Sequence, residues 1–351
     1  MSAFLRGVGL ILTLELKQRV RGVAWYVILG VFFALVALVT VGVWVVTGTW
    51  GGSGGGLFSS IVYFVLLLAS LISPALGGNA INGEREGGTL ATIQVTSVTT
   101  GQIVIGKWLA AWLTSLSLLV VTVPFLGIAV AIGEVSALTV VKSLAVLAAE
   151  LGIFAALGVG LSGLIRKPLF SVVVTYLTVA ALSIGTLIAF GIAGSVTQVE
   201  VRQTTVDYDY GVRTDDDVLA RCAAPVVTTY RTPRFDLYWG VLAANPFVVV
   251  ADASYGDFTA DGAPNDLFGY IAVGVRQAQI PPETDSFRDW CHADGSQYDP
   301  GPTAEQLLRS GVPSWFIGLT IQVVLGALAL FGAWLATRTP SGRLAKGSRI
   351  A

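Results

Sequence analysis

Six long apolar segments constrain this chain of 351 residues more than any other feature. They cover about residues 23–46, 57–79, 108–132, 144–165, 169–193 and 315–336. About 20 mostly apolar residues are enough to cross the roughly 30 Å hydrocarbon core of a bilayer. Hydrophobic residues make up 54% of the chain and charged residues only 12%, which excludes a soluble globular protein of this length. The sequence therefore predicts an all-α polytopic membrane protein with six transmembrane helices.

Twelve of the 21 basic residues lie on one side of this six-span arrangement. They precede the first span, lie between the second and third and between the fourth and fifth, and follow the sixth. The positive-inside rule makes this side cytoplasmic, so we expect both termini there. Lys107, at the head of the third span, is expected to anchor that helix among the headgroups. Residues 1–20 are expected to form an interfacial amphipathic helix on the cytoplasmic leaflet, because their apolar and basic side chains separate on a helical wheel.

The opposite side of the membrane receives a short turn at about residues 133–142 and a long segment, residues 194–312. This segment holds 17 of the 22 acidic residues and both cysteines of the chain. Cysteines confined to an outer segment predict a disulfide between Cys222 and Cys291 in an oxidising compartment. No metal site is predicted, because the single histidine, His292, stands beside one cysteine and lacks the four-ligand set of zinc. We expect it to be a surface residue.

The segment is long enough to form an extracellular domain of its own. Val199 and Val201 alternate with charged residues, as in a strand, and indicate an α+β domain inserted between the fifth and sixth spans. Residues 237–253 are unusually apolar and are interrupted by Pro246. They are either a re-entrant or interfacial segment at the outer leaflet or a buried element of the domain.

Two polar residues inside the spans are candidates for a substrate path. Glu150 lies in the fourth span, where a carboxylate costs about 2.5–3.5 kcal/mol on insertion scales and therefore needs a cavity or a partner. Lys142, two helical turns earlier, is expected to pair with it. Glu150 is either a polar point on a substrate path or a member of an interhelical hydrogen bond. Gln322, in the sixth span, raises the same two alternatives.

The chain shows no catalytic constellation. Residues 101–107 match the phosphate-binding pattern G-x-x-x-x-G-K, but Trp108 stands where a nucleotide site needs Ser or Thr. No H-E-x-x-H sequence occurs, and the acidic run at 215–217 is typical of a solvated surface. We therefore expect no enzyme, no bound cofactor and, at a formal net charge of −1, no nucleic-acid partner.

The loop between the second and third spans carries the sequence Gly83-Glu-Arg-Glu-Gly-Gly-Thr-Leu90. With Gly106-Lys107, it resembles the type-2 ATP-binding-cassette (ABC) exporter permeases, which typically have E-R-E-x-G-T-L here and G-K at the head of the third span. Gly-Val-Gly-Leu-Ser at 158–162 and Asn245-Pro-Phe are also similar to the family, especially to its actinobacterial members. The outer domain is larger than the short re-entrant hairpin usual in such permeases.

The resemblance implies partners and a role for each part of the chain. Two copies of this permease, or this chain and a related one, would join two cytosolic ATPase subunits that bind ATP and magnesium. The loop 80–106 would dock in a groove of the ATPase. Its docking residues would be Glu84, Arg85, Glu86, Gly87, Gly88, Thr89 and Leu90.

The implied function is export by alternating access across a bacterial plasma membrane. The apolar spans suggest a lipid-like or hydrophobic cargo. As an alternative, the chain would relay ATP-driven motion to its extracellular domain without transport. The expected division is 1–20 for the interfacial helix, 21–193 for five spans, 194–312 for the extracellular domain, 313–337 for the sixth span and 338–351 for a cytoplasmic tail.

Overall fold

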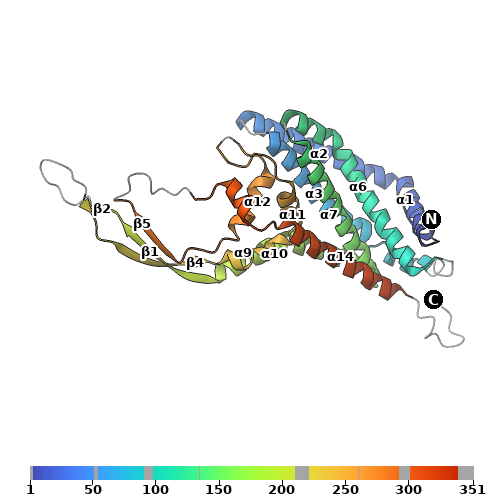
Figure 1. Ribbon diagram of the computed structural model, residues 1–351. Helices are drawn as coiled ribbons and strands as arrows, with labels where there is room; N and C mark the ends of the chain where they lie inside the picture. The colour runs from blue at the N-terminus through green and yellow to red at the C-terminus, as the bar shows by residue number, and fades with distance from the viewer. Residues whose placement is uncertain are drawn as a thin grey trace.

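The computed structural model is a helical bundle from which a β arm projects at one end (Figure 1). It describes residues 3–50, 54–90, 98–133, 135–209, 221–259, 261–291 and 301–338. The start of α1 and the end of α14 lie at the end of the bundle opposite the arm (Figure 1).

Six helical segments in the described parts of the chain are long and apolar enough to cross a membrane. The predicted fold class is therefore confirmed. The spans are α2 (Val23–Trp50), α3 (Gly54–Gly77), α6 (Thr100–Gly133), α7 (Ala137–Leu164), the continuous run of α8 (Pro168–Ala180), the π-helix η1 (Ala181–Gly185) and α9 (Thr186–Val196), and α14 (Trp315–Thr337).

Two helices begin earlier than the hydropathy suggests. The predicted turn at 133–142 is wrong, because α7 already starts at Ala137. Ser136 caps this helix by accepting a hydrogen bond from the backbone N–H of Thr139 at 3.2 Å. The third span likewise starts at Thr100, so the loop before it is shorter than expected. Hydropathy locates the apolar part of a helix, whereas capping determines where the helix begins.

Helix α1 (Ala3–Arg21) packs along α6. Val8 and Ile11 are buried against the bundle, while Phe4 and Leu10 are exposed. The helix predicted at residues 1–20 is therefore present, and its exposed apolar side chains suit a membrane surface. Its location on the cytoplasmic leaflet stays a prediction.

Helices α3 and α7 form the centre of the bundle. Their backbones meet at Gly77 and Gly158, where an added Cβ on either glycine would lie 3.1–3.2 Å from the other residue. Small residues allow such close packing between membrane helices, where lipid provides no hydrophobic driving force. Helix α7 also packs along α14 and α6, so it contacts more of the bundle than the peripheral α2 does.

The β arm continues directly from the fifth span. Strand β1 (Gln198–Val206) follows α9 and pairs with β4 (Val226–Pro233) antiparallel and with β5 (Asp285–Asp289) parallel, in the order β4-β1-β5. A small ladder of β2 (Tyr208–Asp209) and β3 (Arg221–Cys222) extends it. A disulfide joins Cys222 to Cys291, with the Cα atoms 5.4 Å apart. Because the strands continue a span, the arm can move with the fifth helix.

The rest of the outer segment is helical and packs on the bundle. It comprises the 3₁₀ turn η2 (Phe235–Leu237), α10 (Trp239–Ala243), α11 (Pro246–Ser254), α12 (Leu267–Gln277) and α13 (Ala304–Ser310). The apolar stretch at 237–253 is a helical hairpin broken at Pro246. Its second helix is buried among α7, α14 and α12. The stretch is therefore a buried element, as one alternative predicted. It also lies against the spans, as the other alternative predicted.

Candidate functional site

The short helix α4 (Asn82–Glu86) lies between the second and third spans and is fixed to the end of α7. The backbone N–H groups of Ile81 and Asn82 donate to the hydroxyl of Ser162 at 3.0 and 3.1 Å. The buried amide of Asn82 donates to the carbonyl of Ile165. The family-like stretch at 158–162 thus supplies a side chain that holds α4 in place.

Lys107 lies at the centre of a buried charge cluster. Its ammonium group is 2.7 Å from the carboxylate of Glu84 and also bonds to Glu15 of α1. The Lys107 side chain is only 2% exposed. The expectation that Lys107 reaches the headgroups is therefore wrong, because two carboxylates hold it inside the protein. The cluster connects α1, α4 and α6.

Arg85 also faces the protein. Its guanidinium donates to the side-chain oxygen of Asn82 at 3.0 Å and to the carbonyl of Gly163, at the end of α7, at 3.3 Å. A carbonyl near a helix C-terminus carries partial negative charge, which favours a cation there. Arg85 therefore braces α4 against the fourth span.

Only part of the predicted docking sequence is exposed. Glu86, Gly87, Gly88 and Thr89 lie on the surface, whereas Leu90 packs in a buried cluster with Ile81 and Ile103 of the bundle. Gly88 has a φ of 71°, a conformation that glycine adopts without strain. We call residues 86–89 the α4 tip. Residues 91–97 of the predicted loop lie outside the described part of the chain.

The two candidates for a substrate path lie together between α7 and α14. Glu150 and Gln322 are both fully buried, and the Gln322 amide is close enough to affect the carboxyl group. The amide nitrogen of Gln322 donates to the carbonyl of Ala244, at the end of α10, at 3.0 Å. Within the described residues, the carboxyl oxygens of Glu150 and the amide oxygen of Gln322 have no hydrogen-bond partner. The pair therefore has buried polar atoms that these contacts leave unused.

The predicted pairing of Lys142 with Glu150 is wrong. Lys142 is exposed while Glu150 is fully buried. Eight residues advance about 80° around a helix, so the two side chains leave α7 on different faces.

The Asn245-Pro-Phe motif connects the hairpin to the fifth span. The amide nitrogen of Asn245 donates to the carbonyl of Ser183 in η1 at 2.5 Å and to the hydroxyl of Thr186 at 2.9 Å. Its oxygen accepts from the N–H of Phe247 and so caps α11 at 2.9 Å. A π-helix changes the normal helical bonding pattern and often marks a functional position. Asn245 secures the hairpin at this irregular turn.

A buried ion pair joins three outer elements and was not predicted. Arg276 of α12 lies 2.6 Å from one carboxylate oxygen of Asp252 in α11. The other oxygen accepts from the N–H and hydroxyl of Ser314 and from the N–H of Trp315 at 2.5–2.9 Å, where α14 begins. Arg276 also donates to the carbonyl of Val312. In the sequence, the indication of this ion pair is that each of two apolar stretches contains a single charged residue.

The start of α12 is linked to the second span beside its cap, Asp266. The Asp266 carboxylate accepts from the N–H groups of Gly269 at 2.6 Å and Gly256 at 2.9 Å, and the next residue, Leu267, donates to the hydroxyl of Ser59 at 3.0 Å. Burial raises the pKa of Asp266, and the donated hydrogen bonds oppose that rise. At the base of the arm, hydrogen bonds from Arg234 hold the pKa of Asp236 below its ordinary value.

No group of three or more metal-ligating side chains occurs in the described ranges. His292 and the acidic run at 215–217 lie outside these ranges. The geometry thus defines a membrane-embedded protein with an exposed tip at one end, a buried polar pair in its centre and an outer assembly at the other end.

This is the architecture of a membrane permease subunit. The sequence profile of the CcmB protein family matches residues 8–208, which include five of the six spans and the first strand of the arm. The chain belongs to the CcmB family, a family of ABC transporter membrane subunits that work with an ATPase partner. A search of curated proteins finds no match.

Proposed function

We propose that this chain is the permease of an ATP-driven exporter and that the α4 tip docks on the ATPase. The observation that carries this proposal is the tip itself, which is exposed while the charged residues behind it are tied into α1, α6 and α7. Glu86 is the charged residue of the tip and would set the register of docking. Glu84 and Arg85 act as braces inside the permease.

The contacts between α4 and the bundle would transmit a movement of the α4 tip to the spans. Displacement of the α4 tip would act on α7 through Ser162 and Gly163, and α7 packs along α14. At the far end, α14 is bound to the outer hairpin through Gln322 and Ser314. ATP binding would switch access only if the ATPase favours one of the two arrangements, since a ligand shifts an equilibrium by its differential affinity. ATP and magnesium remain on the partner.

The proposed cargo is hydrophobic and passes the polar pair Glu150 and Gln322. Most span surfaces are apolar, and this pair offers unpaired acceptor atoms within the bundle. The CcmB family is described as heme-exporter permeases, so heme is the first cargo to test. Uptake of heme by inverted vesicles containing the complex, compared with vesicles whose ATPase cannot hydrolyse ATP, would measure this activity.

The proposed setting is a bacterial plasma membrane with the α4 tip and both termini in the cytoplasm. The basic residues around the α4 end of the bundle support this orientation. Two permeases, identical or related, would pair with two ATPases.

A second function is favoured by the arm. Strand β1 continues from the fifth span, and the disulfide closes the arm near its far end. A complex of this kind could use ATP to move the arm against an extracellular partner without moving a cargo. ATP-dependent movement of the arm without uptake of any tested cargo would favour this function.

The docking proposal is tested by reversing one charge. Glu86→Lys should reduce co-purification with the ATPase by about tenfold, which corresponds to the loss of about 1.4 kcal/mol at the interface. The matched control is Glu305→Lys, another exposed carboxylate, located on α13 in the outer assembly. Equal ATPase recovery with both variants would contradict docking at the tip.

A further inference from the structure

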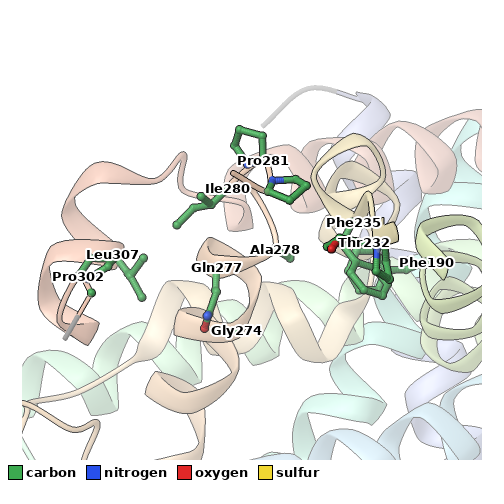
Figure 2. A pocket seen from close by; sticks show the side chains of 13 residues that line it. Phe190, Thr232, Phe235, Gly274, Gln277, Ala278, Ile280, Pro281, Pro302 and Leu307 are labelled. Atoms are coloured by element: carbon green, nitrogen blue, oxygen red, sulfur yellow. The ribbon is translucent and has the colours of Figure 1, made fainter. Parts of the chain in front are cut away.

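A pocket of about 660 Å³ lies where the β arm joins the helical part of the outer segment. Its wall is formed by the end of β4, η2, the end of α12, α13 and one residue of the fifth span, Phe190. Figure 2 shows Phe190, Thr232 and Phe235 on one side, and Pro302 and Leu307 on the other. Its volume falls within the range of about 300–1,000 Å³ that is usual for ligand pockets.

The lining is suited to hydrocarbon. None of the 13 lining residues is charged, and only Thr232 and Gln277 carry side chains that form hydrogen bonds. Four of the lining residues are prolines, which have no backbone N–H to donate. A polar or charged ligand would therefore find few partners here to replace its hydration, whereas an apolar chain would gain by leaving water.

One wall of the pocket is held in place by the fifth span. The rings of Phe190 and Phe235 lie 5.1 Å apart between centroids. Phe235 also packs against the backbone of Gly194, where an added Cβ would come within 2.1 Å of the ring. Only glycine leaves space for this contact. The aromatic wall is thus preformed and needs little ordering when a ligand binds.

The pocket lies at the membrane boundary. Phe190 is six residues before the end of its span at Val196, which corresponds to about 9 Å along a helix. Leu187, about one helical turn before Phe190 and on the same side of α9, is 51% exposed, as lipid-facing residues are. A lipid of the leaflet on the arm side can therefore reach the pocket without crossing a polar surface.

We propose that this pocket binds one acyl chain of a membrane lipid, with the lipid headgroup remaining at the surface. The chain would fill the space between Phe235 and Leu307 and so fasten the base of the β arm to the bilayer. This proposal depends neither on the cargo nor on the ATPase, so the docking experiment and the lipid experiment can fail separately.

The test introduces a large side chain into the pocket, at a lining position that has space for one. Gly274 lines the pocket in α12, and an added Cβ would meet no atom within 4 Å. Gly274→Trp should therefore occupy the space without disturbing the helix, and Gly274→Leu should do so partly. Gly240→Trp is the matched control, because Gly240 is equally open but lies on α10 outside the lining.

The full chain is placed in nanodiscs that contain a phospholipid with a photoreactive diazirine at the end of one acyl chain. After irradiation, labelled peptides are identified by mass spectrometry. We expect labelling of the stretch around Ala278 in the wild-type chain and in Gly240→Trp, and at least a fivefold loss in Gly274→Trp. Labelling of the exposed first span should be the same in all variants and reports that each is folded and inserted.

Three results would overturn the proposal. One is the absence of label on the pocket lining while the first span is labelled. Another is equal labelling of the lining in the wild-type chain and Gly274→Trp, which would place the lipid chains on the outer surface. Labelling by a water-soluble diazirine peptide but not by the lipid probe would also overturn it and would assign the pocket to a protein segment.

Discussion

At the scale of single residues, burial decides what a charged side chain does. Lys107, Glu84 and Glu15 come from three elements of the sequence, yet they meet inside the protein. A buried cation is tolerated when carboxylates replace its water. Glu86, two residues from Glu84, remains exposed. Neighbouring acidic residues in one motif thus have different surroundings, because Glu84 is held inside the protein and Glu86 is exposed at the surface.

Removal of Lys107 should be costly. Lys107→Ala would leave Glu84 without its cation and Glu15 with only the Arg19 guanidinium at 3.9 Å, and we expect a loss of about 3 kcal/mol in stability. This value is at the lower end for buried pairs, because the Glu84 side chain is 20% exposed. Lys142→Ala, at an exposed position of α7, should change stability by about 0.5 kcal/mol or less.

Both variants can be compared by thermal unfolding in the same detergent. A loss for Lys107→Ala that is no greater than the loss for Lys142→Ala would show that the cluster contributes nothing to stability.

At the scale of elements, the outer helices are connected to the spans at their ends. Asp252 binds Arg276 and caps the start of α14, while Asn245 reaches the π-helix of the fifth span. These contacts attach α11 and α12 to two different spans. Movement of either span would therefore displace the hairpin.

Loss of the buried ion pair should loosen this connection. Arg276→Ala leaves Asp252 buried beside the start of α14 without its cation, and we expect destabilisation of about 3–5 kcal/mol. Hydrogen exchange should rise in α12 and in the first turns of α14, and remain unchanged in α2. Arg309→Ala is the matched control. Its ion pair with Glu305 is exposed, so the expected cost is below about 1 kcal/mol.

Equal exchange in the two arginine variants would mean that packing alone holds the hairpin on α14.

At the scale of the whole molecule, the arm and the bundle are stabilised differently. The bundle has a large apolar core, whereas most of β4 is exposed. The disulfide spans 69 residues of sequence and closes the arm. A small sheet with so little buried surface depends on such a crosslink.

Loss of the disulfide should therefore affect the arm alone. A native disulfide contributes about 2–4 kcal/mol on the chain-entropy model. Replacing both Cys222 and Cys291 by serine should make the arm sensitive to limited proteolysis while the six spans remain protected. Cleavage appearing within the bundle at the same protease concentration would contradict an independent arm.

The sequence by itself determined the six spans, the location of the α4 motif and the presence of strands between the fifth and sixth spans. Each of these depends on local composition, because the free energy of membrane insertion is a sum over about 20 neighbouring residues. Local composition also explains why the prediction of a turn at 133–142 was wrong. Ser136 caps α7 ahead of the most apolar part of that helix.

Only the tertiary structure decided which polar residues meet. Glu15 and Lys107 are 92 residues apart, and Ser314 and Asp252 are 62 apart. Lys142 and Glu150 are close in sequence but point to different faces of α7. Hydropathy carries no information about such pairs, because their energy depends on burial and on which helices pack together. The division of the α4 motif into internal braces and an exposed tip follows from that packing.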